Sequence, residues 1–264
     1  MIDKGPVLLD ITDGIARLRL NRPDAANGMS AELLSALCDA IMVCHGHSDL
    51  RVVLLSGEGT NFCAGGDVRA FASKGEKLPD YIRQATAYLQ NAVTGLLRLE
   101  APVIASVQGF AAGGGGFGLG CASDIVIAAE SAKFLAGATR VAMAPDAGVS
   151  VTLSRLVGLR RAMSILLTNP VIPAAEALQM GIVTKVVPDA ELADASLALV
   201  RELAAGAPKA LAATKRLVWA GTGTSIEQCL SEEARTVAEL SGMADAREGL
   251  AAVIERRKPV FTGR

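Results

Sequence analysis

The stretch FAAGGGGFGLG, from Phe110 to Gly120, constrains the fold most, because it lies between two apolar runs that are typical of buried strands. APVIASVQG precedes it and DIVIAA follows it. A run of four glycines inside a core lets another group approach the bare backbone closely. Two interpretations compete: either a dinucleotide phosphate lies against this turn, or the backbone amides point at some other negative charge.

Strand-like and helix-like patterns alternate on both sides of this stretch. The segment PVLLDITDGIARLRL predicts a hairpin that turns at Asp13 and Gly14, and Ser30 begins a helical pattern that leads into the buried strand RVVLLSG. A second helical stripe runs from Ile82 to Leu97, and the strand-like segments KFLAG and GIVTKVV follow the glycines. This alternation is typical of the α/β class.

The strand patterns stop at about Asp189, and successive amphipathic helical patterns fill the rest of the chain. Ser225 and Gln228 predict a capping box at the start of one of these helices. We predict a core over residues 1–200 and a C-terminal helical region over residues 201–264. This region is expected to pack on another subunit, although helices of this kind can equally cover their own core.

The composition indicates a globular protein and disfavours several partners. The 264 residues are 51% hydrophobic with a mean hydropathy of +0.37, enough to bury a sizeable core. A formal net charge of −1 provides no basic field for nucleic acid. The apolar runs are interrupted well before the ~20 residues of a membrane span, and MIDKGPVLLD contains no signal-peptide apolar region. We therefore expect a cytoplasmic protein that binds neither nucleic acid nor membranes.

Neither the cysteines nor the histidines predict a metal site. The five cysteines are far apart and include no C-x-x-C pair, which is typical of reduced thiols. The two histidines, His45 and His47, could form a metal site with Cys44, but they follow a helical pattern and precede a strand. A polar helix end is the favoured interpretation, and it leaves a histidine-based mechanism with a poor candidate.

The glycine stretch also contains the dinucleotide-binding spacing G-x-G-x-x-G, at Gly113, Gly115 and Gly118. That fingerprint normally belongs to the first strand–helix unit and needs an acidic residue about 20 residues further on, whereas Glu130 ends its strand too early. The other use of such a turn is to point amides at the enolate oxygen of an acyl thioester. A second tight glycine loop after a buried strand, NFCAGGDVRAF, could supply the converging amide.

Five motifs fall in the order and spacing of one known family, over nearly the whole chain: LNRPDAANGMS, VVLLSGEGTNFCAGGDVRAF, APVIASVQGFAAGGGGFGLGCASDIVIAAESAKF, MAPDAGVSVTLSRLVG and AEALQMGIVTKVV. Together they resemble the crotonase superfamily, the enoyl-CoA hydratase and isomerase family. The resemblance implies a crotonase-like spiral of strand-strand-helix repeats, a homotrimer or dimer of trimers, and an acyl-CoA thioester as substrate. Coenzyme A then enters as part of the substrate, and no separate cofactor is implied.

The resemblance further implies an oxyanion hole, formed by the amide of Gly66 and a second amide in the glycine run. Counting forward from Gly109 selects Gly114 for the second amide, and counting back from Asp124 selects Gly115. The two counts differ because this chain has one glycine more than the family pattern.

The reaction is chosen by side chains around this hole. The two glutamates of the hydratase branch are missing, since their positions fall at Phe117 or Gly118 and at Ala138. Asp146 is the carboxylate that remains, and moving a double bond from β,γ to α,β needs only one base. We predict an isomerase with Asp146 as that base. A helix-capping role for Asp146, which follows Pro145, is an equally supported and compatible interpretation.

The resemblance also predicts substrate contacts in two loops, the acyl pocket and the chain end: Ala25, Ala26, Cys63, Ala64, Asp67, Ala138, Lys258 and Phe261. Ala26 replaces a basic residue of many family members, which would remove one phosphate contact. Lys258 can equally be a solvated charge, and Asp67 is expected foremost to cap the helix after its loop. The segment VRAFASKGEKLPDYIRQ is expected to wall the acyl pocket.

Four further functions stay open at the level of the sequence. A hydratase or another enolate-forming reaction is the first, and an acyl-CoA-binding trimer with little activity is the second. A 4-chlorobenzoyl-CoA dehalogenase is disfavoured, because Ala138 and Gln90 occupy positions where that branch cradles an aromatic ring and aromatic residues are 3% of the chain. An NAD-dependent dehydrogenase would instead bind the dinucleotide alone.

Overall fold

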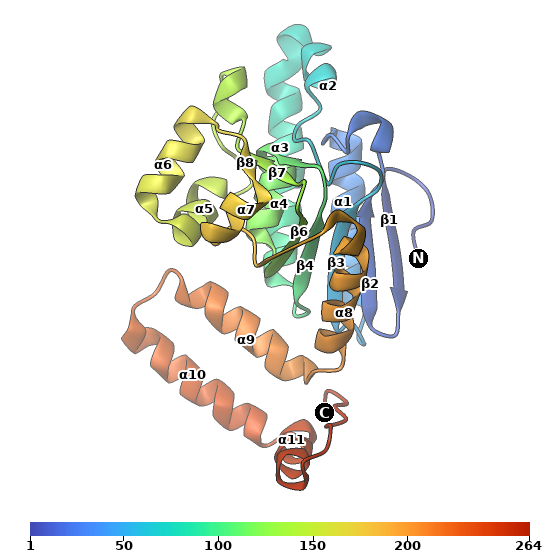
Figure 1. Cartoon of the computed structure of the whole chain (residues 1–264), viewed down its shortest axis with the longest axis vertical. Coiled ribbons are helices and arrows are strands. Elements are labelled where there is room, and N and C mark those ends of the chain that lie inside the picture. The colour runs from blue at the N-terminus through green and yellow to red at the C-terminus, as the bar shows by residue number, and fades with distance from the viewer.

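The computed structural model describes all residues 1–264 and contains two sheets with helices on their faces (Figure 1). The larger sheet has the strand order β1-β2-β3-β4-β6-β9 and the smaller has the order β5-β7-β8. The strands are β1 (Val7–Thr12), β2 (Ile15–Leu20), β3 (Val52–Gly57), β4 (Val103–Val107), β5 (Phe110–Ala112), β6 (Ile125–Ala129), β7 (Lys133–Leu135), β8 (Ile172–Pro173) and β9 (Lys185–Val187).

Helices connect these strands and then make up the C-terminal part of the chain. They are α1 (Ala31–Gly46), α2 (Val68–Ala72), α3 (Leu78–Arg98), α4 (Leu119–Ala122), α5 (Val149–Val157), α6 (Leu159–Thr168), α7 (Ala174–Gln179), α8 (Leu192–Ala204), α9 (Pro208–Gly221), α10 (Ile226–Ser241) and α11 (Ala244–Glu255). The short helical turns are η1 (Pro23–Ala25), η2 (Gly75–Lys77), η3 (Gly114–Gly118), η4 (Ala138–Val141) and η5 (Asp189–Glu191). The predicted α/β class is therefore confirmed.

The predicted hairpin and helix starts are found where the sequence places them. β1 and β2 pair antiparallel with Thr12 opposite Ile15, and both turn residues between them have positive φ, as a two-residue hairpin turn requires. Every later strand of the large sheet joins its neighbour in parallel. The Ser30 side chain accepts a hydrogen bond from Leu33 N at the start of α1, and Ser225 with Gln228 forms the predicted capping box of α10.

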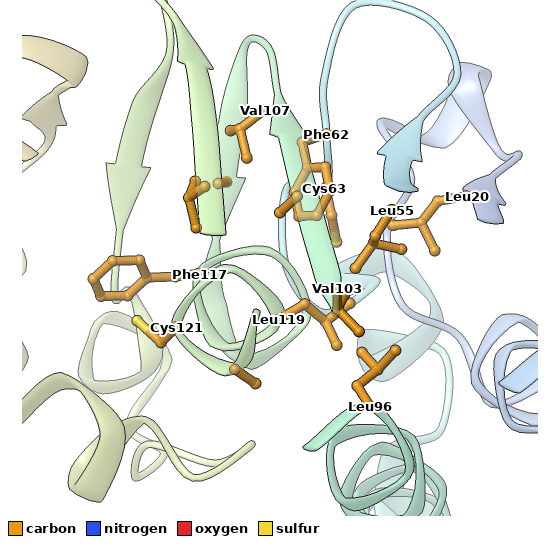
Figure 2. Packing of buried hydrophobic residues seen from close by; sticks show 14 of the residues in the cluster. Leu20, Leu55, Phe62, Cys63, Leu96, Val103, Val107, Phe117, Leu119 and Cys121 are labelled. Atoms are coloured by element: carbon orange, nitrogen blue, oxygen red, sulfur yellow. The ribbon is translucent and has the colours of Figure 1, made fainter. Parts of the chain in front are cut away.

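The core of the molecule continues from the large sheet into the glycine-rich segment. Figure 2 shows Leu55 of β3 and Val103 of β4 packed in one cluster with Phe117 and Leu119, which follow the four glycines. These four side chains are almost completely buried. The glycine turn is therefore held in the centre of the fold by the apolar residues that come after it.

Two isolated bridges bring three loops together. An isolated parallel bridge joins Met29 to Gly66, and another joins Cys63 to Ala111 of β5. The loops around residues 27–29, 63–66 and 111–115 therefore lie side by side at the carboxyl ends of the parallel strands. This edge of a parallel sheet is where ligands of α/β proteins commonly bind.

The C-terminal helices divide into one that covers the sheet and three that extend away from it (Figure 1). α8 contacts β3, β4 and β6, and its Val200 is fully buried. The boundary predicted at residue 200 falls inside this helix, and α9 is the first helix to leave the sheet. The prediction of successive helices after Asp189 is confirmed.

A buried ion pair ties α9 to the core. Lys215 Nζ lies 2.9 Å from Asp124 Oδ2 and donates to the carbonyl oxygen of Leu96 at 2.8 Å. Asp124 also accepts from Trp219 Nε1 at 2.7 Å. Burial lowers the pKa of Lys215, and the Asp124 carboxylate opposes that shift. The pair fixes how the helical region leaves the core.

The five cysteines form no disulfide, and His45 lies at the end of a helix. All five cysteines are free, and no group of three potential ligand side chains comes together. His45 lies in the last turn of α1, as predicted, with Nε2 3.0 Å from the carbonyl oxygen of Gly95.

None of the helices combines the length and the apolar character that crossing a membrane demands.

We predict that Lys215→Met lowers the free energy of unfolding by about 3–5 kcal/mol, because it leaves the largely buried Asp124 carboxylate without its cation. Lys209→Met is the matched control: its exposed pair with Glu100 is expected to contribute about 0–1 kcal/mol. Urea unfolding of both variants measures the difference. Equal, small losses in the two variants would contradict the proposed role of the buried pair.

Candidate active site

A cavity of about 530 Å³ opens where the three loops meet. Its walls are mostly apolar and include Met29, Phe71 of α2, Ile82 and Leu89 of α3, and Leu135 of β7. The cavity brings together six of the residues that the sequence analysis assigned to the site: Ala64, Gly66, Gly114, Gly115, Ala138 and Asp146.

The first glycine loop presents a free amide. Met29 N donates to Gly65 O at 2.8 Å and Asp67 N donates to Met29 O at 3.1 Å, so hydrogen bonds hold the backbone on both sides of Gly66. The amide of Gly66 itself donates to no group of the protein. Gly65 has a φ of +99°, a conformation that glycine adopts without steric cost.

The second glycine loop packs directly on the first. A Cβ placed on Gly113 would lie 3.3 Å from Gly65 Cα and 3.8 Å from Gly66 N, so the two backbones are in van der Waals contact. Gly114 is the first residue of the helical turn η3, and the first amides of a helix have no partner inside it. Free amides of both loops therefore lie close together at the cavity.

Gly114 and Gly115 occupy different surroundings. Gly115 is buried, and a Cβ there would lie 3.0 Å from Cys63 Sγ and overlap the Met29 side chain. Gly114 is half-buried, and a Cβ there would overlap Oδ1 of Asp146. Of the two glycines that the sequence left open, Gly114 is the one next to the carboxylate.

Asp146 presents a carboxylate without a partner to the cavity. No side chain or backbone group of another residue donates to it, and it forms no ion pair. Burial raises its pKa, and a hydrogen bond from its own backbone amide opposes that shift only in part. A partly buried, unpaired carboxylate with a raised pKa is suited to accept a proton from a bound molecule.

The interpretation that Asp146 caps a helix is wrong. α5 begins at Val149 and its N-cap is Gly148, where no side chain accepts a hydrogen bond. Val149 N donates to the backbone carbonyl of Asp146 at 3.0 Å rather than to its carboxylate. The positive φ values of Ala147 and Gly148 separate the helix from Asp146, so the carboxylate is free to face the cavity.

Asp67 does cap a helix, as predicted. Its side chain accepts from Ala70 N at 3.0 Å at the start of α2, and it accepts from Arg22 Nη2 at 3.0 Å. Burial would raise the pKa of Asp67, but these two hydrogen bonds and the guanidinium charge outweigh it and hold the pKa below its usual value. The Asp67 carboxylate therefore stabilises the first glycine loop and the start of α2.

The residues Ala25 and Ala26 lie beside the first glycine loop, in and after the turn η1. Ala64 N donates to Ala26 O at 3.0 Å. Cys63 is buried, and its thiol donates to Asn27 O at 3.1 Å, while burial raises its pKa to about 12. Cys63 therefore acts as an uncharged packing residue at the back of the loop.

Lys258 and Phe261 do not reach the cavity of their own chain. Both follow α11, and the backbone oxygen of Phe261 accepts from Arg51 at 3.0 Å. Phe261 lines a separate apolar groove formed with α10 and α11. Neither residue lines the cavity formed by the glycine loops.

Part of the cavity wall was not identified from the sequence. The segment from Val68 to Gln84 does border the cavity, through Val68, Phe71 and Ile82. Among the residues that were missed are Ala85, Thr86 and Leu89 on α3, Leu135 on β7, Arg140 and Val141 on η4, and Met143 after that turn. The spacing of Ile82, Ala85 and Leu89 indicated a buried helix face, but spacing alone does not distinguish a face on the core from a face on a cavity.

Comparison with known proteins defines the family. Residues 10–264 match the model of the enoyl-CoA hydratase/isomerase family. A probable enoyl-CoA hydratase from Rhodobacter capsulatus is 38% identical over 97% of both chains, and a 1,2-epoxyphenylacetyl-CoA isomerase from Escherichia coli is 34% identical over 98% of both. The crystal structure of an enoyl-CoA hydratase from Bacillus anthracis superimposes with a TM-score of 0.93 at 32% identity, covering 98% of this chain and all of the other.

The chain therefore belongs to the enoyl-CoA hydratase/isomerase family, the crotonase superfamily. The predicted crotonase-like fold is confirmed by the structural match over almost the full chain. The relatives carry both hydratase and isomerase names, so the family alone does not choose the reaction.

We predict that Asp146→Asn melts at a higher temperature than the wild type at pH 7. Burial makes the pKa of Asp146 higher in the folded protein than in the unfolded chain, so the wild type loses stability as the pH rises from the ordinary value, about 3.9, through the raised value. Asparagine stays neutral and avoids this loss. Thermal melts as a function of pH should show the two proteins converging as the pH falls toward the ordinary value.

The exposed carboxylate of Asp80 provides the control for this measurement. Asp80→Asn should show no gain that grows with pH. A wild type that is as stable as Asp146→Asn at every pH would mean that the Asp146 carboxylate is well solvated or paired.

Proposed function

We propose that this protein is an enoyl-CoA isomerase, which moves the double bond of an acyl-CoA thioester from the β,γ to the α,β position. The observation that carries the proposal is that Asp146 is the single carboxylate on the cavity and lies directly against Gly114. One base next to free backbone amides is what this reaction requires.

The amides of Gly66 and Gly114 are proposed to hold the thioester oxygen. Both belong to loops that are fixed by hydrogen bonds or by close packing, so little reorganisation accompanies the development of negative charge on that oxygen. Both glycines line the cavity. Gly114 is favoured over Gly115 because it lies beside Asp146, whereas Gly115 is buried against Met29 and Cys63.

Asp146 is proposed to transfer the proton. The carboxylate removes a proton from C2 of a 3-enoyl thioester, and the electron pair moves into a dienolate whose oxygen is held by the two amides. The same proton returns at C4, so that the double bond lies between C2 and C3 and the carboxylate is regenerated. A raised pKa brings the carboxyl group closer to the operating pH, which favours both transfers.

Hydration is the second candidate, because the relative from Rhodobacter capsulatus is named a probable hydratase. The positions expected to carry the two hydratase glutamates argue against it. The Phe117 ring is buried and packs against Phe134 with ring centroids 6.2 Å apart, and Gly118 packs against Ala147. Ala138 lines the cavity and has no ionisable group. A second carboxylate that could place and activate water is absent there.

The lining of the cavity also argues against dehalogenation and against a pure binding role. Phe71 is the single aromatic side chain that lines it, which disfavours an aromatic-ring substrate of the dehalogenase kind. An acyl-CoA-binding protein with little activity would leave the unpaired carboxylate unexplained. An aliphatic acyl group fits the apolar wall of α2 and α3 best.

Assembly as a homotrimer or a dimer of trimers is part of this proposal. Exposed apolar side chains gather on α10 and α11, among them Val237, Leu250, Val253 and Ile254. Such a surface is typical of a subunit interface. Lys258 and Phe261, which do not reach their own cavity, are proposed to contact coenzyme A from a neighbouring subunit.

We predict that Asp146→Asn lowers the rate of double-bond migration by about 10²- to 10⁴-fold, the usual contribution of one general base. The measurement incubates the protein with a 3-enoyl and a saturated acyl-CoA in deuterated water and follows deuterium uptake and the double-bond position by mass spectrometry. Affinity for the saturated acyl-CoA is expected to change little, because the amides of the oxyanion hole stay in place.

Asp80→Asn serves as the control and should retain the wild-type rate. Formation of 3-hydroxyacyl-CoA by the wild type at a rate above that of migration would favour the hydratase. Binding of acyl-CoA without exchange in either protein would favour a binding role.

A further inference from the structure

Asn169 is a buried residue that neither lines the cavity nor takes part in the proposed mechanism. It is 3% exposed and follows α6 as its C-cap, with φ 49° and ψ 56°. Asparagine and glycine are the residues that end helices most readily in this left-handed conformation. The cap explains the backbone of Asn169, but it does not explain what the side chain does.

The side chain and backbone of Asn169 bind three residues at the start of the turn η4, and two of these, Gly137 and Arg140, line the cavity. Gly137 N donates to Asn169 Oδ1 at 2.6 Å, and Asn169 Nδ2 donates to Thr139 Oγ1. The backbone oxygen of Asn169 accepts from Arg140 Nη2 at 2.5 Å. The end of α6 therefore holds the turn η4 in place through these hydrogen bonds. Ala138, Arg140 and Val141 of this turn line the cavity.

The segment that this turn begins has little regular structure of its own. Between Gly137 and Gly148, φ is positive at Gly137, Ala142, Ala147 and Gly148. Backbone hydrogen bonds within the segment are short-range, such as Arg140 N to Gly137 O and Met143 N to Ala138 O. Contacts with other elements must therefore fix its course, and Asp146 lies near its end.

We propose that Asn169 is a positioning residue for Asp146: its buried amide fixes the Gly137–Arg140 turn, and through it the cavity wall and the place of the Asp146 carboxylate against Gly114. This inference rests on the proposed role of Asp146 as the base. It assigns to Asn169 no contact with substrate. The role differs from that of a helix cap, because it depends on the side-chain amide and not on the backbone conformation.

Asn169→Gly separates the two roles. Glycine retains the left-handed backbone and the carbonyl that accepts from Arg140, and it removes the bonds to Gly137 and Thr139. Arg256→Gly is the matched control, since Arg256 is the left-handed C-cap of α11, far along the chain from the cavity wall. Hydrogen exchange followed by mass spectrometry on both full-length variants measures the order of residues 137–148 directly.

In Asn169→Gly, we expect faster exchange confined to residues 137–148, with wild-type exchange in α1 and β3. We also expect kcat for double-bond migration to fall by about 10- to 100-fold, as for a displacement of a reacting group by about 1 Å, with KM little changed. Arg256→Gly should alter neither quantity.

Wild-type exchange over residues 137–148 in Asn169→Gly would overturn the proposal, whatever the activity. So would an increase spread over the whole chain together with a lower Tm, because that pattern describes a residue of general stability. A wild-type protein that catalyses no migration would defeat the proposed function instead, and the exchange result would still decide whether Asn169 orders the wall.

Discussion

The contact of two glycine backbones is the constraint on which the rest of the site depends. Gly65 and Gly113 approach so closely that a Cβ on Gly113 would lie 3.3 Å from Gly65 Cα, and both have φ values that favour glycine. The contact is possible because Phe117 and Leu119 anchor the second loop in the core and the bridge from Cys63 to Ala111 aligns the first. Side chains larger than hydrogen would separate the two loops and the amides they present.

The site combines two rigid glycine loops with an irregular segment that other elements hold in place. The glycine loops form a fixed backbone, supported by the Asp67 cap and by Asn27 Nδ2, which donates to Glu58 O at 2.9 Å. Asp146, in contrast, lies on an irregular segment and its carboxylate is unpaired. An unpaired, partly buried charge costs stability, and proteins accept such costs where activity needs them. The raised pKa of Asp146 and its lack of a hydrogen-bond partner from another residue therefore both follow from the position of its carboxylate at the partly buried cavity wall.

The sequence and the structure agree best where the pattern is local. The hairpin at Asp13 and Gly14, the Ser30 and Asp67 caps and the alternation of strands and helices follow from residue type and spacing, and all are found. The helix cap assigned to Asp146 failed for a local reason as well. Ala147 and Gly148 both take positive φ, so the helix begins two residues later than the Pro-Asp pattern indicated.

By itself, the sequence determined the α/β class, the family through its motifs, the two glycine loops and Asp146 as the remaining carboxylate. The tertiary structure alone decided that Gly114 and not Gly115 lies beside Asp146, and that Lys258 and Phe261 lie away from the cavity of their own chain. It also placed the Asn169 side chain in hydrogen-bond contact with Gly137 of the cavity wall. Residue spacing fixes which face of an element a side chain shares with its neighbours. It does not fix which element from a distant part of the chain packs against that face, because long-range packing of the whole chain sets those contacts.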